Sequence, residues 1–211
     1  LHYPLRRQRQ MCIRDSYTST QAALPASGGP DPDPPAAKHQ RPAGHFRVES
    51  TMGIAASELS QYVIRPTLIY LDRHCPSAEA LLLGVAASES ALGAALHDRR
   101  GHGLYRIGEL RHQLLWDDFL ARDPELASLV RGLASQHAFL NGPHMELTVN
   151  LRYATAIAWM LIEEQAPRLP DADDLIGLAR IWRQIFQPQG RLRDFTRAWQ
   201  ACIAPLHHQA C

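Results

Sequence analysis

A single carboxylate interrupts the most apolar helical segment of this 211-residue sequence. When residues 81–96 are placed at about 100° per residue, their apolar side chains form one helical face with Glu89 in its middle. No other charged residue lies between Glu79 and Asp98. Because a fully buried glutamate is rare without a partner, this segment constrains both the fold and the chemistry of the chain.

Helical periodicity continues through most of the remaining sequence, and short breakers rich in Pro, Gly or Asn separate the segments. The predicted helices cover residues 57–71, 76–96, 109–121, 124–139, 145–163, 171–186 and 192–202. Pro66 is expected to bend or divide the first helix, and Ser77 and Asp171 are the expected N-caps of the second and sixth. Residues 98–108 are expected to form a loop or a short irregular hairpin. The pattern predicts an all-α domain at 52–203 with 76–96 as its central buried helix.

Both ends of the chain differ from this pattern. Six prolines lie from Pro25 to Pro42 among glycines and aspartates, a composition that buries too little apolar surface to fold. The run 11–16 resembles a string that recurs at the ends of proteins translated from metagenomic contigs, and it looks like translated sequencing adapter. We therefore expect residues 1–51 to be a disordered or artefactual extension, with Met52 as the true start, and 204–211 to be a frayed tail.

Composition argues against several classes of partner. The formal net charge is +1, which gives no electrostatic reason to expect a nucleic acid. No run approaches the roughly 20 apolar residues that cross a bilayer, and no apolar segment follows the basic N-terminus as in a signal peptide. The four cysteines are widely spaced, and no phosphate loop or dinucleotide fingerprint occurs. We expect no nucleic-acid partner, no membrane span, no signal peptide and no cofactor.

Histidines and tryptophans are the other chemically notable residues. His97, His102 and His112 lie close in sequence, but their places on loops and different helix faces favour solvated side chains over a metal site. The tryptophans occur on apolar helical faces, where core packing is expected, although one of them can flank a binding cleft. They are Trp116, Trp159, Trp182 and Trp199.

Two interpretations of Glu89 follow from spacing alone. Burial raises the pKa of a carboxyl group, and a carboxyl that stays protonated near neutral pH can act as a general acid. Alternatively, Glu89 forms an ion pair with an arginine such as Arg106 or Arg152 and holds helices together. Spacing does not separate these interpretations.

Three elements in order resemble the lysozyme-like soluble lytic transglycosylase domain. Glu89-Ser90 ends a helical segment, the run 103–107 (Gly-Leu-Tyr-Arg-Ile) begins fourteen residues after Glu89, and Asn150 precedes a helix of small residues. The resemblance covers about 55–200. More closely, the chain is similar to small phage proteins of that superfamily, through the runs 63–68 and 169–174.

This resemblance implies cleavage of the β-1,4 bond between N-acetylmuramic acid and N-acetylglucosamine, with Glu89 as general acid and then general base. The residues it assigns to substrate binding are Ser90, Gly103, Leu104, Tyr105, Asn150 and Tyr153. In this assignment Ser90 supports the site by hydrogen bonding, and Tyr105 lines the cleft. The implied partners are peptidoglycan glycan strands and other virion proteins. The implied location is a phage virion, or the host cytoplasm before release to the cell wall.

The sequence departs from the family pattern at Arg106, where the family has glutamine. A cation beside Glu89 would favour the ionised carboxylate and oppose the general-acid role. A hydrolysing lysozyme also needs a second carboxylate, which only Asp98 or Glu109 is placed to supply. The alternative is therefore a catalytically inactive lysozyme-like virion or glycan-binding protein. A helical adaptor unrelated to glycans is a further alternative.

Overall fold

The computed structural model describes residues 53–98, 100–135, 142–165 and 168–204, and nearly all of its regular structure is helical. Its elements in chain order are α2 (Ala56–Leu59), η1 (Ser60–Ile64), α3 (Arg65–Tyr70), α4 (Pro76–Ser90), β1 (His97–Asp98), β2 (Gly101–His102), α5 (Glu109–Leu114), η2 (Leu115–Phe119), η3 (Leu120–Arg122), α6 (Pro124–Gly132), α8 (Glu146–Val149), α9 (Leu151–Glu164), α10 (Leu175–Ile185) and α11 (Leu192–Cys202). The predicted all-α class is confirmed, and so is the short hairpin, since β1 and β2 pair antiparallel. The expected extension at 1–51 and nearly all of the expected tail lie outside the described residues.

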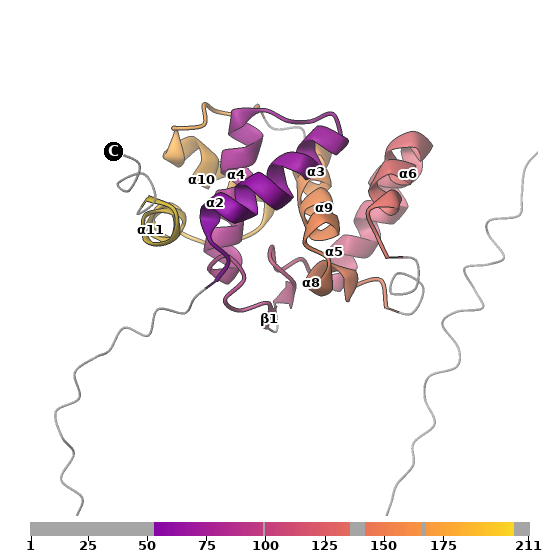
Figure 1. Ribbon diagram of the computed structural model, residues 1–211, viewed down its shortest axis with the longest axis horizontal. Helices are drawn as coiled ribbons and strands as arrows, with labels where there is room; N and C mark the ends of the chain where they lie inside the picture. The colour runs from indigo at the N-terminus through magenta and orange to yellow at the C-terminus, as the bar shows by residue number, and fades with distance from the viewer. Residues whose placement is uncertain (1–52, 99, 136–141, 166–167, 205–211) are drawn as a thin grey trace, which may run out of the picture. The chain divides into compact units, whose positions relative to one another are not determined.

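Helix α4 is the central helix, as the sequence predicted (Figure 1). It packs against α3, α9, α10, α11 and η1, so side chains on all of its faces are buried. Pro76 occupies its first turn, where a missing backbone N–H costs nothing, and the Cys75 sulfur accepts a hydrogen bond from the Ala78 N–H. Cys75 is thus the N-cap in place of Ser77, which lies within the first turn.

The central helix ends at Ser90, six residues before the expected Leu96. The next two residues, Ala91 and Leu92, have φ of 48° and 56°, in the left-handed region. The Ser90 hydroxyl accepts a hydrogen bond from the Gly93 N–H, and this local contact replaces the next helical turn. The chain therefore leaves the helix immediately after Glu89-Ser90 and enters the β1–β2 hairpin.

Three other predicted helices have different bounds. In the segment 124–139, helix α6 ends at Gly132. The segment 145–163 is divided, because the Asn150 side chain accepts a hydrogen bond from the Tyr153 N–H and begins α9 as its N-cap. In the segment 171–186, Asp174 rather than Asp171 is the N-cap, since its carboxylate accepts the Gly177 N–H at 2.9 Å. In the last two cases several polar residues compete for the cap, and periodicity does not rank them.

The first predicted helix is continuous but irregular. Its segments α2, η1 and α3 follow one another without a break, and the middle segment is a π-helix. Pro66 has no backbone N–H, so the regular hydrogen bond to the Tyr62 carbonyl cannot form.

Across the described ranges, none of the helices combines the length and the apolar character that crossing a bilayer requires.

A glycine permits the closest contact of α4 with α11. A Cβ atom added at Gly84 would lie 2.3 Å from Cζ of Phe195, a buried side chain of α11. Any larger residue at position 84 therefore forces α11 to move. This contact explains why a glycine stands in mid-helix, where it otherwise lowers helix stability.

We predict that Gly84→Ala lowers the free energy of unfolding by about 1–3 kcal/mol, because overpacking outweighs the gain in helix propensity. Urea denaturation followed by circular dichroism measures the change. Gly142→Ala is the matched control, since its Cβ would meet only ordinary contacts from Met145 at 3.5 Å or more. A Gly84→Ala protein as stable as the parent would contradict the prediction.

Candidate active site at the end of helix α4

Glu89 lies in the last turn of α4 and is only 5% exposed. The indole Nε1 of Trp182, on α10, donates a hydrogen bond to its Oε1 at 2.8 Å. The Trp182 ring itself lies 5.7 Å from the Phe195 ring and is buried. The carboxyl group therefore has an aromatic donor on one oxygen and apolar side chains around that donor.

Ser90 connects the end of α4 to the segment after the hairpin. Its hydroxyl donates to the Leu104 carbonyl at 2.7 Å, and the side chain is buried. This contact positions the backbone of 103–107 beside the helix end that carries Glu89. Ser90 therefore holds the backbone near Glu89, which is the supporting hydrogen-bonding role that the resemblance implies for it. Its hydroxyl contacts protein and does not face an open surface.

The segment 103–107 packs inward. Gly103 has φ of 71°, and a Cβ there would lie 1.6 Å from the Leu147 carbonyl oxygen, so glycine serves a contact between protein backbones. Leu104 and Tyr105 are each 0% exposed, and the Tyr105 hydroxyl bonds to Thr155 Oγ1 at 3.1 Å. The structure thus places Tyr105 in the core instead of along a cleft, because its hydroxyl finds a partner on α9.

Asn150 and Tyr153 also have structural partners. Besides capping α9, Asn150 donates through Nδ2 to Glu146 Oε2 and to the Leu133 carbonyl, at 2.9 and 2.8 Å. Tyr153 is fully buried, and burial is the main cause that raises its pKa above the ordinary value. The structure brings the three motif segments together in space, but it turns these two side chains toward neighbouring helices.

Arg106 and Arg152 were the sequence-based candidates for an ion pair with Glu89. Arg106 has φ of 48° and donates from Nη2 to the Ala95 carbonyl at 3.4 Å, while Arg152 lies over the Tyr70 ring. The ion-pair interpretation of Glu89 stays a prediction.

A second carboxylate was expected only from Asp98 or Glu109. Glu109 is directed to the hairpin, where its carboxylate lies 3.0 Å from Nε2 of His102, and it is largely exposed. The Asp98 side chain lies outside what the structure describes. Within the described part of the chain, no three His, Cys, Asp or Glu side chains are grouped so as to hold a metal ion.

His112 is buried, in contrast to the solvated side chain expected from sequence. Trp116 Nε1 donates to its Nε2 at 3.2 Å, and an indole nitrogen can only donate, so this Nε2 is an acceptor. The Tyr153 hydroxyl lies 2.7 Å from the same nitrogen. The other ring nitrogen, Nδ1, lies 3.0 Å from Nδ1 of His144. This network joins α5 to α9 and needs a neutral His112.

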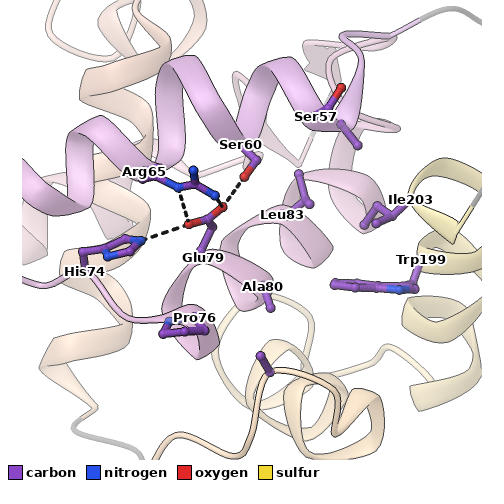
Figure 2. Close-up of a pocket in the computed structure, with 12 residues that line it drawn as sticks. Ser57, Ser60, Arg65, His74, Pro76, Glu79, Ala80, Leu83, Trp199 and Ile203 are labelled. Carbon is purple, nitrogen blue, oxygen red and sulfur yellow. Dashed lines mark hydrogen bonds and ion pairs between the residues drawn. The ribbon is translucent and has the colours of Figure 1, made fainter. Parts of the chain in front are cut away.

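A pocket of about 700 Å³ lies at the opposite end of α4, and Glu89 is not among its lining residues (Figure 2). Glu79 lines it together with side chains of η1 and α11. From sequence, Glu79 was only a first-turn helix charge. No local signal in the sequence marked this pocket, because its walls come from segments more than 100 residues apart.

Comparison with protein-family models, with curated proteins and with solved structures gives no match to this chain.

We predict that acid weakens the fold through His112. Burial lowers its pKa to about 4, and the neighbouring His144 and His102 add to this effect. An unfolded histidine titrates near 6.5, so between pH 6.5 and about 4 the unfolded chain binds more protons than the folded one. The free energy of unfolding should therefore fall as the pH falls through this window.

Urea denaturation at several pH values measures that slope for the parent and for His112→Gln. We expect the parent's slope to be steeper by up to about 1.4 kcal/mol per pH unit, the limit for one proton. The difference between the two proteins removes the contribution of the carboxylates, which titrate in both. Equal slopes would show that His112 is not the responsible group.

Proposed function

We propose that this protein is a lytic transglycosylase that cleaves the β-1,4 bond between N-acetylmuramic acid and N-acetylglucosamine in peptidoglycan. The observation that carries the proposal is the placement of Glu89: a buried carboxyl at a helix end, with one oxygen held by the Trp182 indole. The order of the three motif segments and the Ser90–Leu104 contact support it.

The proposed reaction uses Glu89 twice. In the first step the protonated Glu89 carboxyl donates its proton to the glycosidic oxygen. Proton transfer breaks the C1–O bond, and the 2-acetamido oxygen of the substrate attacks C1. The Glu89 carboxylate then takes the proton of the 6-hydroxyl, O6 closes the 1,6-anhydro ring on C1, and the acetamido group is released. Glu89 ends protonated, and neither water nor a second carboxylate is consumed.

Replacement of the proton donor tests the proposal. We expect Glu89→Gln to reduce muropeptide release from purified peptidoglycan by about 10²–10⁴-fold, since the amide cannot donate the proton. Mass spectrometry of the products distinguishes 1,6-anhydro ends from hydrolysed ends. Glu125→Gln, a change of the same kind at an exposed position of α6, is the control and should keep its activity. Equal release by the parent and Glu89→Gln would dismiss the mechanism.

A separate prediction concerns the indole donor. Trp182→Phe keeps most of the apolar contact but removes the N–H that holds Glu89 Oε1. We expect the rate of release to fall about tenfold, the equivalent of one hydrogen bond to a group that ionises during the reaction. A full melting curve of the variant controls for folding. A Trp182→Phe rate equal to that of the parent would mean that the indole has only a packing role.

The second candidate function is glycan binding without cleavage in a virion protein. It is favoured by the 5% exposure of Glu89 and by Arg106 at the position where the family has glutamine. The two candidates differ in one measurement. Under the second, the parent sediments with insoluble peptidoglycan but releases no muropeptides, and Glu89→Gln behaves identically.

A further inference from the structure

The pocket at the start of α4 has a polar side and an apolar side (Figure 2). Ser57 and Ser60 line the polar side with Glu79, and Leu83, Trp199 and Ile203 line the apolar side. Its volume of about 700 Å³ falls within the range of small-molecule sites. Ten residues separate Glu79 from Glu89 on one helix, about 15 Å along its axis, so this pocket is distinct from the candidate active site.

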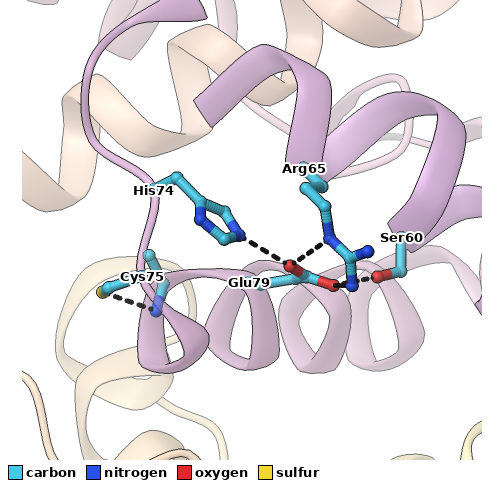
Figure 3. Close-up of polar contacts among 6 residues, drawn as sticks. Ser60, Arg65, His74, Cys75 and Glu79 are labelled. Atoms are coloured by element: carbon cyan, nitrogen blue, oxygen red, sulfur yellow. Dashed lines mark hydrogen bonds and ion pairs between the residues drawn. The ribbon is translucent and has the colours of Figure 1, made fainter. Parts of the chain in front are cut away.

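Glu79 organises the polar side (Figure 3). Arg65 binds its carboxylate through Nε and Nη2 at 3.0 and 2.9 Å, His74 Nε2 lies 3.0 Å from Oε2, and the Ser60 hydroxyl donates to Oε1. Burial alone would raise the pKa of Glu79, but the hydrogen bonds from Arg65, Ser60 and His74 outweigh it and lower the pKa to about 2. Glu79 is therefore an ionised carboxylate with both oxygens already engaged.

This arrangement selects against strongly charged ligands. The charge of Arg65 is compensated by Glu79, so an anion meets no net positive charge. Both carboxylate oxygens of Glu79 already have hydrogen-bond partners, so neither is available to a cation. A neutral ligand suits the pocket best, provided that it offers groups that accept and donate hydrogen bonds.

Polar groups remain to meet such a ligand. In the described part of the chain, the Ser57 hydroxyl, Nη1 of Arg65 and Nδ1 of His74 make no hydrogen bond, while the other nitrogens of these two side chains are fixed by Glu79. The orientation of Arg65 and His74 is thus set before any ligand arrives. Groups held in place in this way bind hydroxyl and amide groups with little further ordering.

The apolar side carries an aromatic platform. The Trp199 ring lies 6.3 Å from the Phe195 ring at an interplanar angle of 26°, so the buried phenylalanine fixes the indole. Trp199 is half-buried, and it lines the pocket together with Leu83 and Ile203. A flat apolar ring opposite hydrogen-bonding groups suits a ligand with one apolar face and a polar edge.

We propose that this pocket is a second binding site for a neutral saccharide that carries N-acetyl groups, separate from the site of cleavage. The C–H face of a sugar ring covers Trp199, and the acetamido methyl group meets Leu83 and Ile203. The hydroxyl and amide groups bind to Ser57, Arg65 and His74. This binding does not depend on Glu89, so the proposal stands or falls separately from the proposed reaction.

Calorimetric titration of the full chain with the β-1,4-linked tetramer of N-acetylglucosamine tests the site, in the Glu89→Gln background so that no ligand is cut. Trp199→Ala removes the platform, and Ser57→Trp fills the pocket from an exposed position without breaking a contact within the protein. We expect each to raise the Kd at least tenfold. Tyr62→Ala is the matched control: this aromatic residue is 66% exposed and does not line the pocket, so the Kd should stay within twofold.

Cellotetraose, which has the same linkage without acetamido groups, should bind at least tenfold more weakly. Equal binding of the two sugars, no binding of the N-acetylglucosamine tetramer, or an unchanged Kd in Trp199→Ala and Ser57→Trp would each overturn the proposal. If Trp199→Ala does not fold, the Kd of Ser57→Trp alone tests the proposal. Muropeptide release by the parent is measured separately, so loss of binding here and loss of cleavage at Glu89 remain distinguishable.

Discussion

Burial of α4 on all of its faces is the constraint on which the rest of the structure depends. Five neighbouring elements cover this helix, and Gly84 admits the Phe195 ring at a distance that no other residue type allows. Because the helix is enclosed, a carboxylate near its C-terminal end loses its contact with water. It then needs a hydrogen-bond donor from the protein. The Trp182 indole is such a donor, so packing of α10 onto α4 fixes both the fold and the environment of Glu89.

The two ends of α4 place carboxylates in opposite chemical settings. Glu79, in the first turn, accepts hydrogen bonds from Arg65 and Ser60 and has His74 beside it, which stabilises the ionised form. Glu89, in the last turn, is buried and accepts an indole N–H. The first setting organises side chains around a permanent charge, and the second suits a group that exchanges a proton. One helix thus places two carboxylates in chemically different environments.

Sequence patterns predicted the positions of helices better than the roles of single side chains. Helical spacing gave the central helix, its buried glutamate and the hairpin after it, because periodicity reports which face is apolar. It did not give the cap residues Cys75 and Asp174, since several neighbours can accept the same N–H groups. Tyr105 was assigned to a cleft from a motif, yet its hydroxyl bonds to Thr155, fifty residues away.

The sequence by itself determined that the chain forms an all-α domain around one apolar helix and that Glu89 is buried in this helix. Local spacing is sufficient for this, because side-chain direction along a helix repeats with a fixed period. Only the tertiary structure decided which groups surround Glu89, why His112 is buried, and that a pocket forms at Glu79. These features join residues that lie 93, 32 and more than 100 positions apart, and no local pattern encodes such contacts.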